Sequence, residues 1–168
     1  YTAKRTLDML QELYEEKLVT YPRTDSQFVT EDMKDTVDEL VGKMPVLLPF
    51  VDYGQLGHGV KRVINNAKVS DHHAILPTNE AVEKGISDLP SDKKNLMMLI
   101  CQQLVQATGE EYLYEQTDIT VKCQEHDFKA RGKMPVQMGF KEVEKAFKNQ
   151  CVKAEAVDEK EKDASIPA

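Results

Sequence analysis

The sequence has few cysteines and no long uninterrupted apolar run. Its three cysteines, Cys101, Cys123 and Cys151, are an odd number spaced far apart, which argues against a disulfide framework and a CxxC-type zinc site. We therefore expect a reducing, intracellular compartment. Because no run approaches the roughly 18 apolar residues of a membrane-spanning helix, the sequence excludes a membrane protein.

The sequence also has fewer basic than acidic residues. The 22 Lys and Arg residues are outnumbered by 29 Asp and Glu residues, which gives a formal net charge of −7. A length of 168 residues fits one domain, or one domain with an appendage, but not two full catalytic domains. Because the chain starts at Tyr1 without an initiator methionine, a signal or a transit composition, we expect it to belong to a larger polypeptide.

Apolar residues at helical spacing predict three long helices. The first covers residues 2–18, and Tyr14 belongs to its apolar stripe. The second begins at Thr30, where acidic residues fill the first turn, and ends before Pro45. The third covers residues 91–109.

The other segments are shorter. Prolines and glycines predict turns with at most short helices over residues 45–90. Alternating apolar and polar residues over 117–122, followed by an extended run over 128–131, predict a β-hairpin. A short helix over residues 140–147 completes a fold of the α+β class that is mainly α.

These elements divide the chain into three parts. Residues 1–110 form a helical domain, and residues 111–150 contain the hairpin. Residues 151–168 are rich in Lys, Glu, Asp and Ala with few apolar anchors, so we expect a flexible charged tail.

Residues 20–26 combine groups suited to phosphate chemistry. Along an extended backbone Tyr21, Arg23 and Asp25 share one face, which places a phenol, a guanidinium and a carboxylate on one surface. The guanidinium favours the phenolate of a neighbouring tyrosine and binds phosphate oxygens in pairs. The alternative is a Tyr-Pro turn with a surface ion pair, and spacing alone favours it, because such short patterns recur by chance.

A second cluster contains two adjacent histidines, His72 and His73, within residues 70–78. On an extended segment they point to opposite faces, so one functional histidine is favoured over a metal-binding pair. An imidazole can donate a hydrogen bond to a phosphate oxygen or transfer a proton near pH 7. The alternative is a pair of loop histidines that bond to the backbone. The preceding residues Lys61, Arg62 and Lys68 make this part of an acidic chain locally basic.

Together these two segments resemble a known family. Residues 18–26, Leu-Val-Thr-Tyr-Pro-Arg-Thr-Asp-Ser, resemble the active-site signature of type IA DNA topoisomerases. Residues 71–78, Asp-His-His-Ala-Ile-Leu-Pro-Thr, are similar to the second signature of that family. Both segments are closer to the signatures of the topoisomerase III branch than to those of topoisomerase I. Topoisomerase I usually has Met after the tyrosine and a single His followed by Glu. The resemblance covers about residues 1–148.

The resemblance implies roles for particular residues. Tyr21 matches the nucleophile that attacks a phosphate of single-stranded DNA, leaving a 5′-phosphotyrosine. Arg23 matches the arginine that positions the phosphate, and His72 matches the histidine that hydrogen-bonds to it. Asp25 and Thr24 match orienting residues.

The resemblance also implies a fold and partners. The helical domain is similar to the winged-helix-like domain of the family, and the hairpin to a segment returning to its β-rich arch. Magnesium is bound in the full-length enzyme by an acidic Toprim domain, whose Asp-x-Asp pattern this sequence lacks. Partners are single-stranded DNA, the rest of the parent polypeptide, and a helicase or single-strand-binding protein. The location is cytoplasmic, with nucleoid association in a bacterium.

The missing Asp-x-Asp pattern and the acidic net charge both oppose a complete enzyme. The net charge of −7 opposes tight non-specific DNA binding, because that affinity comes largely from cation contacts with phosphates. The resemblance makes Lys61, Arg62 and Lys68 candidate DNA contacts. Arg131 on the hairpin is a further candidate, although a solvated strand edge is favoured there. We therefore expect a catalytically silent fragment of an active enzyme. The alternative is a catalytically idle module that binds DNA or a protein partner.

Overall fold

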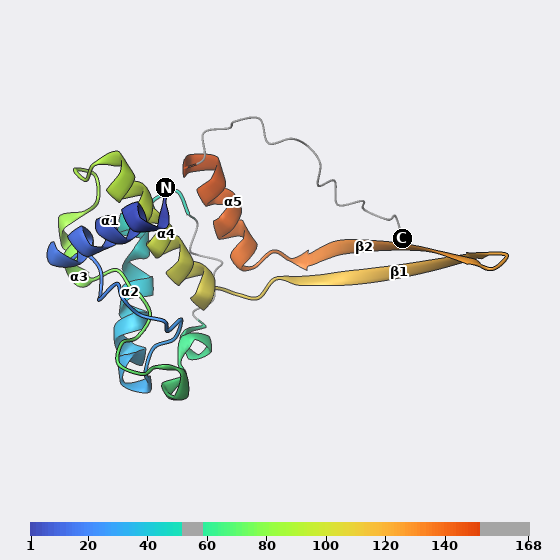
Figure 1. The fold of residues 1–168 in the computed structure, drawn as a ribbon, viewed down its shortest axis with the longest axis horizontal. Helices are drawn as coiled ribbons and strands as arrows, with labels where there is room; N and C mark the ends of the chain where they lie inside the picture. Colours follow the sequence, from blue (N-terminus) through green and yellow to red (C-terminus); the bar gives the residue numbers. More distant parts are fainter. Residues whose placement is uncertain (52–58, 152–168) are drawn as a thin grey trace.

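The computed structural model describes residues 1–51 and 59–151, in which helices precede and follow one β-hairpin (Figure 1). The mainly α, α+β class predicted from the sequence is confirmed. Of the predicted tail over 151–168, residues 152–168 lie outside the described residues. The helices are α1 (Ala3–Glu15), α2 (Lys34–Leu47), α3 (Asn79–Lys84), α4 (Ser91–Thr108) and α5 (Phe140–Cys151), with 3₁₀ helices at Glu31–Met33, Val60–Val63 and Asn66–Lys68.

Helix α1 is shorter than the predicted 2–18. The Thr2 side chain caps its first turn by accepting a bond from the Arg5 backbone N–H at 3.3 Å. The helix ends because Lys17 adopts a left-handed conformation with φ of 63°, and the Leu18 N–H donates to the Leu13 carbonyl at 2.9 Å. This turn sends the chain directly into the segment that carries Tyr21.

Helix α2 continues past Pro45, so the prediction that it ends before this proline was wrong. A proline inside a helix removes one backbone hydrogen bond and crowds the preceding turn. Here it lies in the last turn, where Met44 and Leu47 are buried in the core and Leu48 N–H donates to the Met44 carbonyl at 2.8 Å. Burial of these apolar side chains favours one more helical turn.

The core lies between α1, α2 and α4. The largest fully buried side chains of the core include Met9, Leu13, Met44 and Met97. Lys93 on α4 holds α1 against this core through Nζ contacts to Glu12 at 2.9 Å and Glu16 at 2.8 Å. These two carboxylates raise the pKa of Lys93.

The hairpin extends away from the helices (Figure 1). Its strands, β1 (Leu113–Cys123) and β2 (His126–Gln137), are longer than the predicted 117–122 and 128–131. Gly132 and Pro135, which argue against a strand, pair with Thr117 and Tyr114. They are tolerated because each strand of this two-stranded sheet has a free edge.

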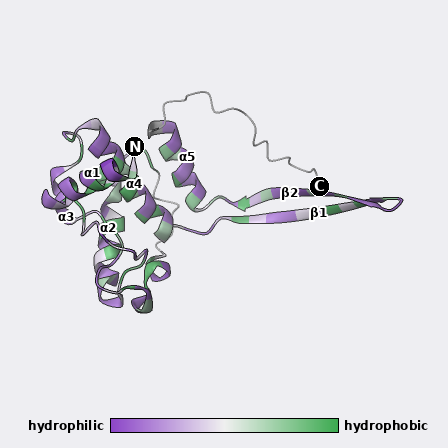
Figure 2. Ribbon diagram, in the orientation of Figure 1, coloured by the Kyte–Doolittle hydropathy of each residue, from purple (hydrophilic) through white to green (hydrophobic). Residues whose placement is uncertain are grey.

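Both faces of the hairpin are exposed, and they differ in chemistry. The register places Ile119 opposite Ala130 and Val121 opposite Phe128 on one face, where Phe128 is 63% exposed. Charged residues dominate the other face. Hydrophobic and hydrophilic residues are interspersed along both strands in Figure 2.

Helix α5 returns the chain to the helical part and packs against α4. The predicted helix over 140–147 is therefore confirmed and extends to Cys151. Gly139 makes the junction possible, since it has φ of +49° and lies against the Glu110 and Glu111 carbonyls. Val143 anchors α5 with a fully buried side chain.

Candidate functional site

Two segments distant in sequence lie side by side at the candidate site. Val19 and Pro77 form an isolated antiparallel bridge. On either side of it, Thr20 N–H donates to the Leu76 carbonyl at 3.0 Å, and Thr78 N–H donates to the Leu18 carbonyl at 3.1 Å. The two sequence signatures are therefore joined by backbone hydrogen bonds.

Side-chain hydroxyls extend this connection toward the histidines. Thr20 Oγ1 donates to the Ala74 carbonyl at 3.3 Å and accepts from the Leu76 N–H at 2.9 Å. Thr24 Oγ1 donates to the His72 carbonyl at 3.0 Å and accepts from the Ser26 N–H at 3.1 Å. Thr24 thus fixes the backbone that carries His72.

The Tyr21 ring contacts two other rings. Its centroid is 4.2 Å from that of His72, with 38° between the planes. On α1, the Tyr14 ring meets Tyr21 edge-to-face, with centroids 5.5 Å apart and planes at 84°. The edge-to-face arrangement of Tyr14 and Tyr21 is favourable for an aromatic pair. The structure therefore brings Tyr21 and His72 into contact although they are distant in sequence.

Arg23 and Asp25 point outward from the segment. Both are exposed, whereas Thr24 and Ser26 between them are partly buried and Pro22 is buried. This alternation agrees with the extended backbone predicted from the sequence. Within the described part of the chain, Arg23 has no carboxylate within 4.0 Å, so the surface ion pair considered above is not formed.

The two histidines have different environments. His72 is exposed, while His73 is partly buried and its Nδ1 lies 2.7 Å from the Ala74 carbonyl. His73 therefore has the backbone contact that a structural loop histidine makes. The His72 ring is the one that contacts Tyr21.

The candidate DNA contacts differ in which groups their charged side chains already contact. The Arg62 guanidinium lies 3.4 Å from the Thr108 carbonyl and 3.7 Å from Glu111. Lys61 is exposed. Lys68 is also exposed, and its Nζ lies 4.7 Å from the centre of the Phe28 ring.

Arg131 lies on the hairpin, away from the two signatures (Figure 1). Its Nε donates to Asp118 at 2.5 Å, and this bond lowers the pKa of the Asp118 carboxyl. The guanidinium is therefore already paired across the hairpin.

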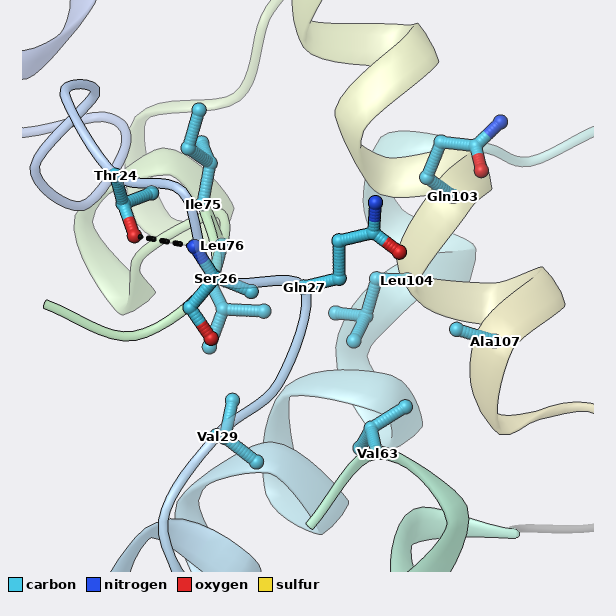
Figure 3. Close-up of a pocket in the computed structure, with 11 residues that line it drawn as sticks. Thr24, Ser26, Gln27, Val29, Val63, Ile75, Leu76, Gln103, Leu104 and Ala107 are labelled. Atoms are coloured by element: carbon cyan, nitrogen blue, oxygen red, sulfur yellow. Dashed lines mark hydrogen bonds between the residues drawn. The ribbon is translucent and has the colours of Figure 1, made fainter. Parts of the chain in front are cut away.

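A pocket with a volume of 360 Å³ adjoins the tyrosine segment (Figure 3). Its walls include Val29, Ile75 and Leu104, while Gln27 and Gln103 supply amide groups. Tyr21, Arg23 and His72 do not line it, so the pocket is separate from the groups that could act on a phosphate.

The side chains of residues 1–51 and 59–151 do not form a metal-binding site. These residues contain no group of three or more His, Cys, Asp or Glu side chains that could hold an ion. Over the same ranges, no helix combines the length and the apolar character needed to cross a bilayer.

One neighbour of Tyr21 was missed in the sequence. Tyr14 fits the apolar stripe of α1, but its side chain is 39% exposed and faces the Tyr21 ring. A tyrosine among leucines in that stripe was the available signal. It does not reveal the contact, because the direction of the chain after α1 is set by the turn at Lys17.

Comparisons with known proteins agree with these two signatures. A family model described as DNA topoisomerase matches residues 1–167. The chain is 39% identical over 145 residues to a DNA topoisomerase 3 of Staphylococcus saprophyticus, covering 83% of this chain and 20% of that protein. It is 37% identical over 173 residues to a DNA topoisomerase 3 of Bacillus licheniformis, covering 99% of this chain and 23% of that protein.

A DNA topoisomerase 3 of Bacillus subtilis is 36% identical over 178 residues, covering 100% of this chain and 23% of that protein. The chain thus spans about a fifth of the length of these relatives. Because the family model covers nearly every residue, the chain belongs to the DNA topoisomerase family, as a type IA, topoisomerase III-like sequence.

Proposed function

We propose that this chain is the tyrosine-bearing part of an enzyme that cleaves and reseals single-stranded DNA, allowing strand passage with relaxation or decatenation. The observation that carries the proposal is the 4.2 Å contact between the Tyr21 and His72 rings. It joins two segments that match the signatures of one family. A partly exposed phenol together with an exposed imidazole and an exposed guanidinium suits a phosphodiester substrate.

In the proposed cleavage step, the Tyr21 phenolic oxygen forms a bond to the phosphorus of a backbone phosphodiester. The bond between phosphorus and the 3′ oxygen breaks, and the proton lost by the phenol is balanced by protonation of that oxygen. The products are a 5′-phosphotyrosine and a free 3′ hydroxyl. Because one phosphodiester is exchanged for another of similar energy, resealing reverses these steps without ATP.

Neighbouring residues would act on the phosphate. Arg23 is exposed and has no carboxylate partner within the described residues, so its guanidinium is free to bind two phosphate oxygens. His72 would donate a hydrogen bond where negative charge develops. Thr24 would orient His72 through the bond to its carbonyl, and Asp25 would orient Arg23 once DNA is bound.

DNA contacts would come from the two exposed lysines of the basic segment. Lys61 and Lys68 are exposed, whereas Arg62 and Arg131 have carboxylate partners at Glu111 and Asp118. An unpaired ammonium binds phosphate without first losing an ion pair. We therefore place the first two lysines ahead of the two arginines as DNA contacts.

The remaining machinery would lie outside these residues. The relatives are about five times longer than the matched segment, and the described residues offer no metal-ligand cluster. We propose that magnesium is bound by an acidic Toprim domain elsewhere in the full-length polypeptide. A helicase or single-strand-binding protein would act with it, in the cytoplasm.

The chain would contribute to two parts of that enzyme. Residues 1–110 would form the tyrosine-bearing helical domain, and residues 111–150 would return to a β-rich arch. The hairpin supports this division, because its face with Val121 and Phe128 is exposed and apolar. Such a face is normally covered in a folded protein.

The proposal is tested by trapping the covalent intermediate. The full-length polypeptide is mixed with magnesium and a labelled single-stranded oligonucleotide, and denaturing gels report protein-linked DNA. Tyr21→Phe should abolish the adduct while leaving the melting temperature unchanged, because the phenolic oxygen forms the new bond. An adduct with this variant would refute the assignment of Tyr21.

The histidines provide a matched pair of variants. His72→Ala should slow cleavage roughly a hundredfold, a loss typical of removing a group that stabilises developing charge, whereas His73→Ala should act mainly on stability. The reverse pattern would show that the second signature is assigned to the wrong histidine. The 168-residue chain alone should form no adduct with DNA and magnesium.

A further inference from the structure

Tyr14 is the second ring that confines the proposed nucleophile. It lies on the last turn of α1, seven residues before Tyr21. Its ring meets Tyr21 edge-to-face at 5.5 Å, while His72 lies at 4.2 Å from Tyr21. The nucleophile therefore has one aromatic neighbour from each of two other segments.

We propose that Tyr14 is a positioning residue for strand cleavage, which restricts the Tyr21 ring so that its hydroxyl is aimed at the scissile phosphate. The proposal rests on the proposed function of Tyr21. It concerns ring geometry and not proton transfer, because no hydrogen bond from the Tyr14 hydroxyl is present among the described residues. A ring, and not a phenol, is what position 14 must supply.

The backbone of Tyr14 is itself fixed. Its carbonyl accepts a bond from the Lys17 N–H at 2.9 Å, and the neighbouring Leu13 side chain is fully buried. Lys93 ties the same end of α1 to α4 through Glu12 and Glu16. The end of α1 therefore holds the Tyr14 backbone in one position.

The need for such a constraint follows from the surroundings of Tyr21. The segment that carries it is held at Val19, Thr20 and Thr24, on either side of Tyr21, and the Tyr21 side chain is partly exposed. An unrestrained ring would sample several rotamers, most of them unproductive. Misplacement of a reacting group by about 1 Å can reduce a rate about a hundredfold.

The first experiment compares three variants of the full-length polypeptide under single-turnover conditions with a labelled oligonucleotide. Tyr14→Leu should lower the cleavage rate roughly tenfold to a hundredfold while DNA affinity and melting temperature stay near the wild-type values. Tyr14→Phe should retain the wild-type rate, because it keeps the ring. Tyr114→Leu is the matched control, since Tyr114 is similarly exposed, at 42%, and contacts Tyr112 on the hairpin.

The outcomes separate the two proposals. If the wild-type enzyme forms no adduct, the proposed function fails. If the wild type cleaves and Tyr14→Leu cleaves equally fast, or Tyr14→Phe is as slow as Tyr14→Leu, the positioning role is wrong. A rate loss matched by an equal loss of DNA affinity or of folded protein would likewise overturn it.

A second experiment needs no activity. In the 168-residue chain, NMR of labelled tyrosine rings reports the shielding of Tyr21 by its neighbours, with Tyr21→Phe used for assignment. Tyr14→Leu should shift the Tyr21 ring signals and broaden their rotamer distribution, and Tyr114→Leu should not. Unchanged Tyr21 signals in the Tyr14→Leu variant would refute the contact on which the inference rests.

Discussion

Gly139 should be the glycine least tolerant of substitution in the described part of the chain. A Cβ there would lie 2.2 Å from the Glu111 carbonyl oxygen and 2.6 Å from that of Glu110. These are backbone atoms, so no flexible side chain can move aside. The backbone φ of +49° also disfavours any residue with a side chain.

The cost of Gly139→Ala follows from three contributions. The left-handed backbone costs about 1–2 kcal/mol for a non-glycine residue. Relief of the overlap costs about 1–3 kcal/mol, by analogy with overpacked cores. Moving residues 110 and 111 away also weakens the 2.9 Å bond from the Phe140 N–H to the Glu110 carbonyl, which is worth about 1 kcal/mol. We expect a total of about 3–6 kcal/mol.

Two other glycines serve as controls. Gly85 has φ of +72° and ψ of 177° but nothing within 4 Å of its Cβ position, so Gly85→Ala isolates the backbone cost of about 1–3 kcal/mol. Gly42 lies inside α2 with open space around it. Gly42→Ala should stabilise the chain by about 0.5–1 kcal/mol.

The assay is chemical denaturation of the 168-residue chain followed by circular dichroism, with hydrogen exchange in α5 as a local readout. The order of stability should be Gly42→Ala, wild type, Gly85→Ala and Gly139→Ala. Hydrogen exchange distinguishes global unfolding from separation of α5 from α4. If Gly139→Ala costs no more than Gly85→Ala by both readouts, the close packing at the hairpin base is wrong.

Two further predictions concern charge and thiol chemistry. Lys93→Met should lower the free energy of unfolding by about 1 kcal/mol at low salt and by less at high salt, which double-mutant denaturation measurements would show. Because the pKa of Lys93 is raised above 10.5, this contribution to stability is present below pH 10.5 and is lost as the pH rises through the folded-state pKa. Burial raises the pKa of Cys101 from 9.0 to about 12, so a thiol reagent followed by peptide mapping should modify exposed Cys123 before Cys101 at pH 8. The folded Cys101 thiol keeps its proton between pH 9 and 12 while the unfolded one loses it, so Cys101→Ala should flatten the fall of stability over that range. Equal modification rates of the two thiols in the folded chain would contradict the burial of Cys101.

The main secondary structure was predictable because it depends on local patterns. The apolar stripes of α1, α2 and α4 repeat at helical spacing, and the alternation around Ile119 and Val121 predicts a strand. The outward direction of Arg23 and Asp25 also followed from the two-residue period of an extended segment. The family resemblance came from short runs of residues and needed no structure.

Some boundaries were decided by tertiary packing. Proline at position 45 opposes a helix locally, but burial of Met44 and Leu47 extends α2 beyond it. Gly132 and Pro135 oppose a strand locally, but pairing with β1 extends β2 across them. In each case contacts distant in sequence outweigh a local preference of a few kcal/mol at most.

The arrangement of the candidate site was determined only in three dimensions. The sequence identified Tyr21 and His72 separately, and the backbone bonds from Thr20 to the segment around Leu76 bring their rings together. It gave no indication that Tyr14 faces Tyr21, because that contact depends on the left-handed turn at Lys17. Residue spacing determines which side of an element a side chain occupies, whereas the neighbours it meets there depend on how the whole chain packs.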